Sequence, residues 1–552
     1  MKKTWWKESV VYQVYWRSFY DSNGDGIGDL QGVLEKLDYI QKLGVDVIWL
    51  NPFYESPDRD NGYDISDYES VMEKAGDLET FKELLSAIHD RGMKVIMDLV
   101  VNHTSDQHPW FLESESSKDN AKRDWYIWRE GKGDGPPNNW RSYFEPSSWT
   151  YNEATEDYYF HSFAKEQPDL NWKNDELRKE IFRMMRSWLD LGIDGFRMDV
   201  INLLAKQDGF PDADDPSHIS YLADNPGIHD YLQEMNREVL SHYDVMTVGE
   251  IPFVTPETGL LYVHEDRNEL NTLFHFQVAD EMPVMDLKRY KEIQESWYKG
   301  TFEKGWNSQF LNNHDHTRQV TRYGNDGQYR VESAKLLGIM LHTLPGMPYI
   351  YQGEEIGMTG VRFDSIDDYN DIAMKNKYKE EVEKGRDPEE VFESLLLLSR
   401  DNSRTPMQWN ANDNAGFTSG KPWIKINPNY REINVEKALE DPSSVFYTYQ
   451  NLIELRKEHP VMTYGDYTDL SYGKDPLYLY TRSYEGVTWL VILNHSDDQL
   501  GVDIPERYAK KSARLIIGNY QVSNDERGHM PEQIRLQPHE ARVYEIKENR
   551  VV

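Results

Sequence analysis

The sequence predicts an α/β protein: a (β/α)8 TIM barrel, with a loop-rich domain inserted after the third strand and an all-β domain at the C-terminus. Three observations support this prediction. Eight short segments rich in β-branched and aromatic residues are mostly separated by segments with helical spacing. Several of the eight end in His, Asp, Glu or Asn, as expected at the end of a barrel that carries an active site. No G-x-G-x-x-G motif follows a strand, which disfavours a doubly wound sheet.

The predicted barrel covers residues 1–103 and 171–460. Its strands are expected within residues 10–19, 45–52, 95–103, 192–202, 245–250, 271–276, 309–315 and 347–355. Its helices are expected within residues 33–43, 81–91, 175–191, 228–240, 331–344 and 445–459. A charged helical excursion is expected near residues 365–399.

Two further domains interrupt or follow the barrel. Residues 104–170 break the alternation of strands and helices and are rich in Trp, Tyr, Pro, Gly and Asn, which predicts an inserted, loop-rich domain. Residues 461–552 contain short β-type stretches separated by Gly, Asp and Asn turns, which predicts an all-β domain.

The composition of the chain limits the partners that it can bind and the chemistry that it can perform. The chain has 552 residues, 38% hydrophobic and 13% aromatic residues, and a formal net charge of −35. This is the composition of a globular protein with more than one core, and its charge would repel nucleic acid. The absence of cysteine excludes disulfides and thiol catalysis.

The N-terminal residues carry lysines but no apolar stretch typical of a signal peptide, and no run of 18 apolar residues occurs. We therefore expect a cytoplasmic protein without a membrane partner, monomeric or weakly homo-oligomeric.

A loop with oxygen-bearing side chains at alternate positions follows the first predicted strand. Asp21, Asn23, Asp25 and Asp29 are separated by small residues, a pattern suited to a hard cation such as Ca²⁺. Gly32 stands where an EF-hand has its bidentate glutamate, so a polar turn without metal is the alternative. No organic cofactor is expected.

Three carboxylates end successive predicted strands: Asp199, Glu250 and Asp315. Arg197 shares a strand face with Asp199 and is expected to keep the pKa of Asp199 low, although that stretch alone slightly favours a purely structural ion pair. Barrel geometry would bring the three together, and two carboxylates are what glycosidic hydrolysis requires. His103 stands singly and no H-E-x-x-H motif occurs, which disfavours a metal hydrolase, although His314 and His316 have H-x-H spacing.

Several motifs carry a resemblance to a known family. The sequences DLVVNHTSD (98–106), QPDLNW (167–172), GFRMDVIN (195–202), TVGE (247–250), NNHD (312–315) and SRDNSRTPMQW (399–409) resemble those of the α-amylase superfamily, glycoside hydrolase family 13. Within it the chain is most similar to the oligo-1,6-glucosidase and α-glucosidase group. The resemblance implies that Asp199 is the nucleophile, Glu250 the general acid and then base, and Asp315 the residue that stabilises the transition state.

The resemblance also implies the remaining site residues. It places around the non-reducing glucose the residues Asp60, Tyr63, His103, Phe144, Phe163, Gln167, Arg197, Val200, His314 and Arg400. Asp60 with Arg400 would close the pocket and make the enzyme exo-acting, and Val200 is the form associated with α-1,6 linkages. The implied calcium ligands are Asp21, Asn23, Asp25, Asp29 and the carbonyl of Ile27.

The function expected from this resemblance is a retaining exo-α-glucosidase acting on small oligosaccharides, isomaltose-like ones first. The alternatives are an α-1,4-preferring α-glucosidase with transglucosylation activity, a trehalose-6-phosphate hydrolase, and a non-catalytic sugar-binding relative. The net charge of −35 disfavours a phosphorylated substrate, and the presence of all three carboxylates disfavours a non-catalytic protein.

Overall fold

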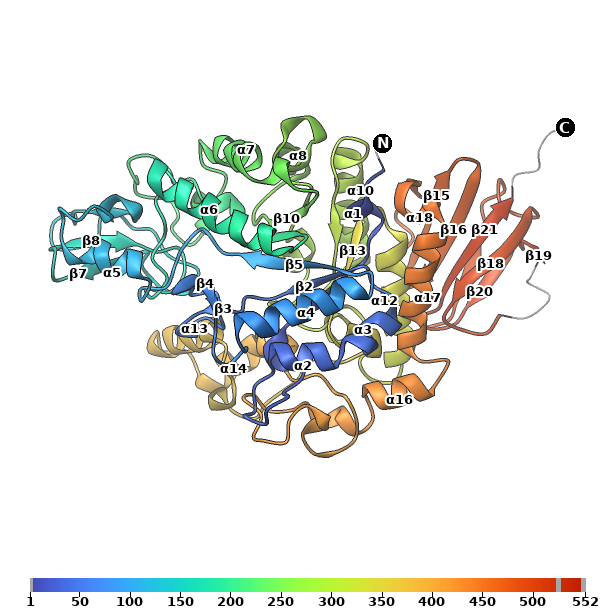
Figure 1. Cartoon of the computed structure of the whole chain (residues 1–552). Helices are drawn as coiled ribbons and strands as arrows, with labels where there is room; N and C mark the ends of the chain where they lie inside the picture. The colour runs from blue at the N-terminus through green and yellow to red at the C-terminus, as the bar shows by residue number, and fades with distance from the viewer. Residues whose placement is uncertain (1–2, 523–527, 548–552) are drawn as a thin grey trace.

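The computed structural model of the protein describes residues 3–522 and 528–547 (Figure 1). Within these residues, an eight-stranded sheet has the order β11-β10-β9-β5-β2-β1-β13-β12, with every pairing parallel. A parallel bridge between Leu273 and Asn307 joins the two outer strands. The predicted barrel is therefore confirmed. Its strands are β1 (Val11–Val14), β2 (Val47–Leu50), β5 (Lys94–Leu99), β9 (Gly195–Met198), β10 (Met246–Glu250), β11 (Thr272–Phe274), β12 (Ser308–Gln309) and β13 (Met347–Tyr351).

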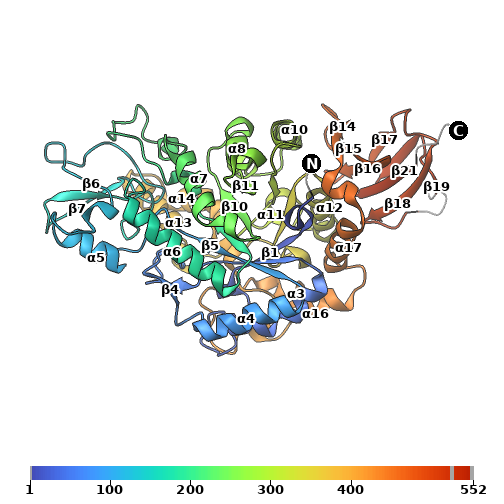
Figure 2. The same cartoon turned by 45° about the horizontal axis from the view of Figure 1, so that its top comes forward.

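Helices surround this sheet (Figures 1 and 2). The longer ones are α4 (Leu78–Asp90), α6 (Asp175–Leu191), α7 (Ile228–Glu238), α10 (Leu287–Thr301), α12 (Arg330–Thr343) and α17 (Val445–Glu458). The shorter ones are α1 (Trp5–Glu8), α2 (Leu30–Glu35), α3 (Leu37–Leu43), α8 (Pro256–Val263), α9 (Gln277–Glu281), α11 (Gln319–Tyr323), α15 (Asp401–Arg404), α16 (Val435–Glu440) and α18 (Pro460–Tyr464).

Helix α6 leads into the strand before Asp199, and its sequence explains both of its ends. The Asn174 side chain accepts hydrogen bonds from the first-turn N–H groups of Glu176 and Leu177. Gly192 ends the helix in the left-handed conformation, with φ 114°. Strand β9 then begins at Gly195, where a Cβ would lie 1.8 Å from the carbonyl oxygen of Met246. A glycine there lets β9 and β10 pair closely, which brings their carboxyl ends together.

The segment between β5 and α6 forms its own small sheet at one end of the molecule (Figures 1 and 2). It contains α5 (Pro109–Ser116) and the antiparallel strands β6 (Trp128–Arg129), β7 (Trp149–Asn152) and β8 (Asp157–Phe160). Its core is aromatic, with Phe111 stacked on Trp128 at 5.8 Å between ring centroids. The boundaries 104–170 assigned from the sequence stay a prediction.

An all-β domain lies at the opposite end (Figures 1 and 2). Its larger sheet has the order β14-β15-β16-β21-β18-β19, and β17 pairs with β20. The strands are β14 (Asp466–Asp469), β15 (Leu477–Tyr484), β16 (Val487–Asn494), β17 (Leu500–Asp503), β18 (Ser512–Gly518), β19 (Gly528–His529), β20 (Gln533–Leu536) and β21 (Ala541–Lys547). The all-β prediction is confirmed; residues 523–527 and 548–552 of it, like residues 1–2 of the predicted barrel, lie outside the described residues.

The predicted charged excursion is helical in the structure. It contains α13 (Ile372–Glu383) and α14 (Pro388–Leu395) and packs around the buried side chains of Phe363, Tyr369 and Met374. The excursion ends next to Arg400, which belongs to the candidate site.

All eight strands are shorter than the segments predicted to contain them, and two of these show what ends the strand. The strand expected over residues 309–315 is only β12, because polar side chains fold the chain after it into a turn. The Asn313 side chain accepts a hydrogen bond from the Asp315 N–H, and its carbonyl accepts one from the His316 N–H. The strand expected over residues 10–19 ends at Val14, before a 3-10 helix at Trp16–Ser18. An antiparallel hairpin of β3 (Tyr54–Glu55) and β4 (Asp67–Val71), which was not predicted, flanks residues 56–66.

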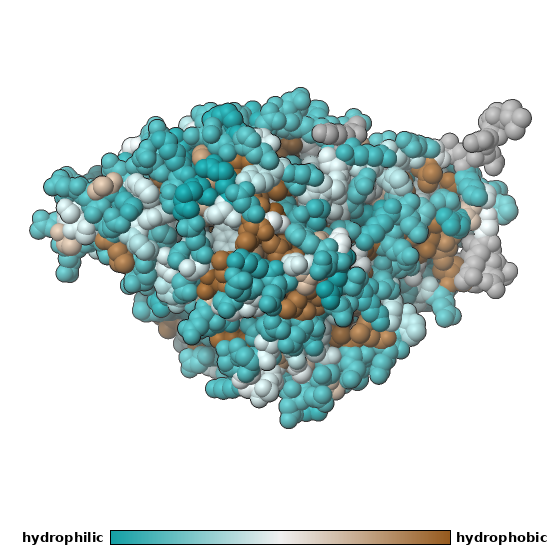
Figure 3. Space-filling view, viewed as in Figure 1, coloured by the Kyte–Doolittle hydropathy of each residue, from teal (hydrophilic) through white to brown (hydrophobic). Residues whose placement is uncertain are grey.

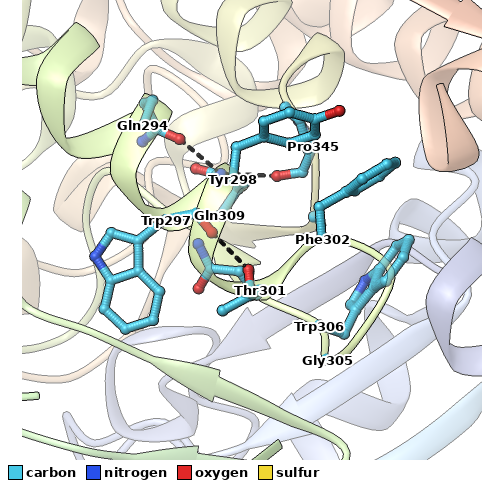
Figure 4. Close-up of a pocket in the computed structure, with 11 residues that line it drawn as sticks. Gln294, Trp297, Tyr298, Thr301, Phe302, Gly305, Trp306, Gln309 and Pro345 are labelled. Atoms are coloured by element: carbon cyan, nitrogen blue, oxygen red, sulfur yellow. Dashed lines mark hydrogen bonds between the residues drawn. The ribbon is translucent and has the colours of Figure 1, made fainter. Parts of the chain in front are cut away.

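A small cavity lies at the amino-terminal end of β12 and β13, away from the carboxylates (Figure 4). Its volume is about 20 Å³, the size of one water molecule. Gln309 donates hydrogen bonds to Gln294 Oε1 at 2.9 Å and to the Pro345 carbonyl at 2.8 Å. These bonds tie α10 to the barrel.

The face in Figure 3 is dominated by hydrophilic residues with scattered apolar patches. Across residues 3–522 and 528–547, no helix combines the length and the apolar character that crossing a bilayer requires.

Candidate active site

The three predicted carboxylates meet at the carboxyl ends of the barrel strands. Asp199 directly follows β9, Glu250 is the last residue of β10, and Asp315 lies six residues after the end of β12. Asp199 and Glu250 are buried, with 6% and 8% of their surface exposed, whereas 30% of the Asp315 side chain is accessible. The site therefore lies where active sites of barrel enzymes lie.

Arg197 binds two of these carboxylates with one guanidinium. Its Nη1 lies 2.5 Å from Asp199 Oδ1, and its Nη2 lies 2.7 Å from Glu250 Oε2. Nη1 also donates to Asp98 Oδ1 at 2.7 Å. The planar guanidinium thereby fixes the two catalytic candidates relative to each other. The interpretation of Arg197 and Asp199 as an isolated ion pair does not describe this network.

The two carboxyl groups differ in proton affinity. Burial raises the pKa of Glu250 to about 8 in spite of Arg197, with Asp199 and Asp315 raising it further. Burial also raises the pKa of Asp199 to about 6, outweighing the lowering effect of Arg197. The expectation that Arg197 keeps the Asp199 pKa low is thus wrong in its net direction, because a fully buried carboxylate loses more hydration than one shared guanidinium replaces. Asp199 still ionises before Glu250.

Asp315 has the opposite environment. Burial acts to raise its pKa, but His314, Arg404 and Arg400 outweigh burial and hold the pKa well below its ordinary value. Arg404 donates to Asp315 Oδ1 at 2.7 Å, and His314 Nε2 lies 2.9 Å from Oδ2. Arg400 Nη1 lies 3.6 Å from Oδ1. Asp315 is therefore an anion throughout the neutral range.

His314 is held neutral and oriented. Burial lowers its pKa, and its ring stacks on Tyr63 with 5.5 Å between centroids. The Gln13 amide nitrogen lies 2.8 Å from Nδ1 and also donates to Asn51 Oδ1. Since that amide nitrogen only donates, Nδ1 accepts and the ring hydrogen lies on Nε2, facing Asp315 and the Tyr63 hydroxyl.

A second network closes the other side of the site. Arg400 Nη1 lies 3.4 Å from Asp60 Oδ1, and Arg400 Nε donates to Asp371 Oδ1 at 2.8 Å. Gln167 donates to Asp60 Oδ2 at 3.2 Å and lies 3.3 Å from His103 Nε2. Asp60 lies between β3 and β4, and His103 and Gln167 follow β5 and β8. Asp371 lies in the helical excursion and Arg400 directly after it, so the site is assembled from four separate parts of the chain.

Aromatic rings line this network. The Arg400 guanidinium lies 5.2 Å from the centre of the Phe144 ring. Phe144 contacts Phe163 at 5.5 Å between centroids, and Phe163 contacts His103 at 5.1 Å. The two phenylalanines named from the resemblance therefore lie beside the polar residues named with them.

Val200 has an unusual backbone. It follows Asp199 with φ 35° and ψ 45°, in the left-handed region. Its N–H donates to Glu250 Oε2 at 3.0 Å. The structure thus brings Val200 into contact with the catalytic candidates through its main chain, which the sequence does not indicate.

Four residues of the site were not identified from the sequence: Gln13, Asp98, Asp371 and Arg404. Asp98 and Arg404 lie inside motifs that carry the family resemblance, so those motifs held a signal for them. Gln13 sits in the apolar first strand and Asp371 in the charged excursion, and no local pattern separates them from their neighbours.

The candidate calcium loop lies apart from this site, against residues 417–423. Asp21 Oδ1 accepts from the Asn23 and Gly24 N–H groups, and the Asn23 and Asp25 side chains each accept the N–H two residues on. All the candidate metal-ligand atoms in this loop are oxygens, and backbone N–H groups hold the side chains that carry them. Oxygen ligands suit a hard cation such as Ca²⁺. No group of three His, Cys, Asp or Glu with metal-binding geometry occurs among residues 3–522 and 528–547, so a cation here would depend on Asn23 and on the Ile27 carbonyl.

Comparisons with known proteins agree with this geometry. The model of the alpha amylase catalytic domain matches residues 13–465. An oligo-1,6-glucosidase from Parageobacillus thermoglucosidasius is 54% identical over 99% of this chain and 100% of its own. Two solved structures each cover 99% of this chain and 100% of their own. The trehalose-6-phosphate hydrolase of Bacillus licheniformis is 44% identical with TM-score 0.93, and the isomaltulose synthase of Klebsiella sp. LX3 is 40% identical with TM-score 0.96. The chain belongs to the α-amylase family of glycoside hydrolases.

Proposed function

We propose that the protein is a retaining, exo-acting α-glucosidase that releases glucose from the non-reducing end of short α-glucosides, α-1,6-linked ones first. The observation that carries this proposal is the pair Asp199 and Glu250, bound by the two terminal nitrogens of one guanidinium. Inverting enzymes keep their carboxyl groups about 6.5–9.5 Å apart to admit a water molecule between them and the sugar. Retaining enzymes keep theirs about 5–5.5 Å apart, and two carboxyl groups bound by one guanidinium suit this closer spacing.

In the first step, the ionised Asp199 oxygen attacks the anomeric carbon and forms a covalent glucosyl ester. The protonated Glu250 gives its proton to the glycosidic oxygen as that bond breaks, so the aglycone leaves as an alcohol. The different pKa values of about 6 and 8 supply one base and one acid between those pH values.

In the second step, Glu250 accepts a proton from water, the hydroxide attacks the anomeric carbon, and Asp199 leaves as a carboxylate. Glucose departs with its original configuration. The ionised Asp315 and the Nε2–H of His314 would hold sugar hydroxyls and favour the positive charge that develops on the ring.

The exo preference rests on Asp60 and Arg400. Their ion pair of 3.4 Å, supported by Asp371 behind Arg400, joins two separate chain segments. A glucose ring bound against this bridge has no room for a further sugar on its non-reducing side. We expect Arg400→Ala to raise KM for a disaccharide more than it lowers kcat.

The linkage preference rests on Val200 and on the relative named as an oligo-1,6-glucosidase, 54% identical over its whole length. An α-1,4-preferring α-glucosidase with transglucosylation activity is the alternative, and pocket differences of this kind change selectivity by only about 1–3 kcal/mol. Assaying one preparation on isomaltose, maltose, sucrose, trehalose and trehalose 6-phosphate tests the choice. Negligible kcat/KM on isomaltose beside rapid maltose hydrolysis would contradict the linkage and leave the catalytic residues in place.

The catalytic assignment has its own test. Asp199→Asn removes the nucleophile while keeping the shape of the side chain. We expect hydrolysis of an aryl α-glucoside to fall by at least about 1000-fold, because the covalent step is lost. Near-normal hydrolysis by a folded Asp199→Asn protein would show that the mechanism is wrong.

We also propose that the loop of residues 21–29 holds one structural Ca²⁺, through Asp21, Asn23, Asp25, Asp29 and the Ile27 carbonyl. The fit of the oxygen donors supports this. Calcium binding measured by titration calorimetry should disappear in Asp21→Ala, and chelation should lower the Tm of the wild-type protein but not of that variant. A wild-type protein that binds no Ca²⁺ would favour the polar turn.

The cytoplasmic location and the monomeric or weakly associating state stay predictions. Cell fractionation and light scattering during size-exclusion chromatography test them.

A further inference from the structure

The backbone of Val200 is strained. A φ of 35° is uncommon for any residue except glycine, and for a β-branched residue it is an outlier. The side chain is nevertheless 92% buried, packed in the cluster that contains Leu203, Phe210 and Leu222. Strain of this kind persists only where the surrounding structure imposes it, and it gathers at functional sites.

The strained turn directs one N–H group at the candidate acid. The Val200 N–H donates to Glu250 Oε2 at 3.0 Å, and Arg197 Nη2 reaches the same oxygen at 2.7 Å. An oxygen that accepts from two donors, one of them charged, is the unprotonated oxygen of a carboxylic acid. The proton of Glu250 therefore lies on Oε1.

We propose that the main-chain N–H of Val200 is a positioning group: with Arg197 it holds Oε2 of Glu250 as an acceptor, so that the acidic proton stays on Oε1, available to the glycosidic oxygen. This proposal rests on the proposed function, in which Glu250 is the acid. The left-handed backbone is what places the N–H of the residue after the nucleophile on the acid, and thereby couples the two catalytic groups.

The proposal predicts a specific change when the N–H is removed. The charged and titratable groups around Glu250 are Arg197, Asp199, Asp315, Asp98 and Tyr143. All of them stay in place, so only the hydrogen bond is lost. A donor to a carboxylate favours its ionised form, and its loss should raise the pKa of Glu250. The carboxyl group should also lose its fixed orientation and deliver its proton less well.

The experiment replaces Val200 with the matching α-hydroxy acid, which converts the N–H into an ester oxygen and keeps the side chain. The control makes the same change at Leu203, whose N–H donates to the Val200 carbonyl at 2.9 Å and not to Glu250. Both proteins are assayed on aryl α-glucosides with leaving groups of increasing pKa, since a poor leaving group needs the proton and a good one does not.

For the Val200 ester we expect kcat/KM to fall about 10–100-fold on the poorest leaving groups and little on the best, as for loss of one hydrogen bond to a charged group. The alkaline limb of the pH profile should move to higher pH. The Leu203 ester should lower all rates by a similar factor and leave the limb unmoved. A Val200 ester that behaves like the Leu203 ester would overturn the proposal.

Val200→Gly gives a second test that does not depend on the ester protein folding. Glycine keeps the N–H and adopts φ 35° without strain, so the dependence on leaving group should stay that of the wild type. A steeper dependence in Val200→Gly would overturn the proposal, because the N–H is still present. A wild-type protein that hydrolyses no α-glucoside would instead contradict the proposed function itself.

Discussion

A single residue, Arg197, organises the chemistry at the smallest scale. Its guanidinium touches Asp98, Asp199 and Glu250, yet it does not make both catalytic candidates anions. Three carboxylates and one cation, all buried, leave an excess of negative charge that is most easily relieved by one proton. Glu250, with the higher pKa, retains it. Because the site contains fewer cations than carboxylates, Glu250 keeps a proton and can act as the acid, while Asp199 is ionised and can act as the base.

This arrangement predicts a bell-shaped pH dependence of kcat/KM for an aryl α-glucoside. Below about pH 6 the Asp199 nucleophile becomes protonated, and above about pH 8 the Glu250 acid loses its proton, so activity falls on both sides. Measured initial rates between pH 4.5 and about 9.5 check both limbs.

The control is Glu250→Gln. On an aryl glucoside with a very good leaving group, its weak activity should lose the alkaline limb, because glutamine does not titrate. The acidic limb should stay, since a glutamine amide can donate to Asp199 as the protonated acid does. An alkaline limb that survives in Glu250→Gln would assign that limb to another group.

At the scale of elements, the inserted sheet is tied to the barrel by a buried lysine. Lys206 Nζ lies 2.7 Å from Asp169 Oδ2 at the end of the insert and donates to Asn102 Oδ1 at 2.7 Å. It also donates to the Leu203 carbonyl. Asn102 also contacts His103, so the contacts of Lys206 lie next to a residue of the candidate site.

We expect Lys206→Met to destabilise the protein by about 3–5 kcal/mol, because it leaves the Asp169 carboxylate buried without a counter-charge. KM should rise as His103 loses its support. Adding Asp169→Asn should recover part of the stability. Denaturant unfolding and limited proteolysis of the insert measure both effects.

Lys173→Met is the matched control for this prediction. Lys173 pairs with Asp208 at the surface, with 61% and 87% of the two side chains exposed. Such an exposed pair contributes little to stability. If Lys206→Met cost no more than Lys173→Met, the tie between insert and barrel would not depend on Lys206.

The elements of the barrel could be predicted because each strand is a local apolar run and each long helix a local amphipathic pattern. Helix α6 matches the predicted range 175–191 at both ends, owing to the cap at Asn174 and the glycine at 192. The strand expected over residues 309–315 could not be delimited, because side chains of Asn313 and its neighbours compete with the sheet for backbone hydrogen bonds.

The residues of the site could be predicted from the sequence, but their pKa values and hydrogen bonds could not. The strand ends of Asp199, Glu250 and Asp315 follow from the local pattern and the barrel. The pKa of Asp199 depends on burial, and the N–H of Val200 donates to Glu250, which is 50 residues away in the sequence. Both are set by parts of the chain that are distant in sequence, so no local pattern encodes them.

At the scale of the whole molecule, charge is the dominant feature. The chain has 96 acidic and 61 basic residues, so many carboxylates have no basic partner. Salt bridges at the surface cannot neutralise this excess, and the folded state carries a net self-repulsion that the expanded unfolded chain partly escapes.

We therefore expect the Tm at pH 8 to rise when sodium chloride is increased from 10 mM to 100 mM. The screening length then falls from about 30 Å to about 10 Å, which weakens repulsion between distant carboxylates while leaving buried pairs such as Arg197 and Asp199 intact. For domains of 150–250 residues, each kcal/mol of relieved repulsion corresponds to about 2–4 °C. Scanning calorimetry at the two salt concentrations measures the rise. The same pair of scans at pH 5, close to the isoelectric point of 4.9, should show almost none, because the net charge is then near zero. An equal rise at pH 5 would mean that salt acts through specific ion binding or apolar burial, and not through the charge of the molecule.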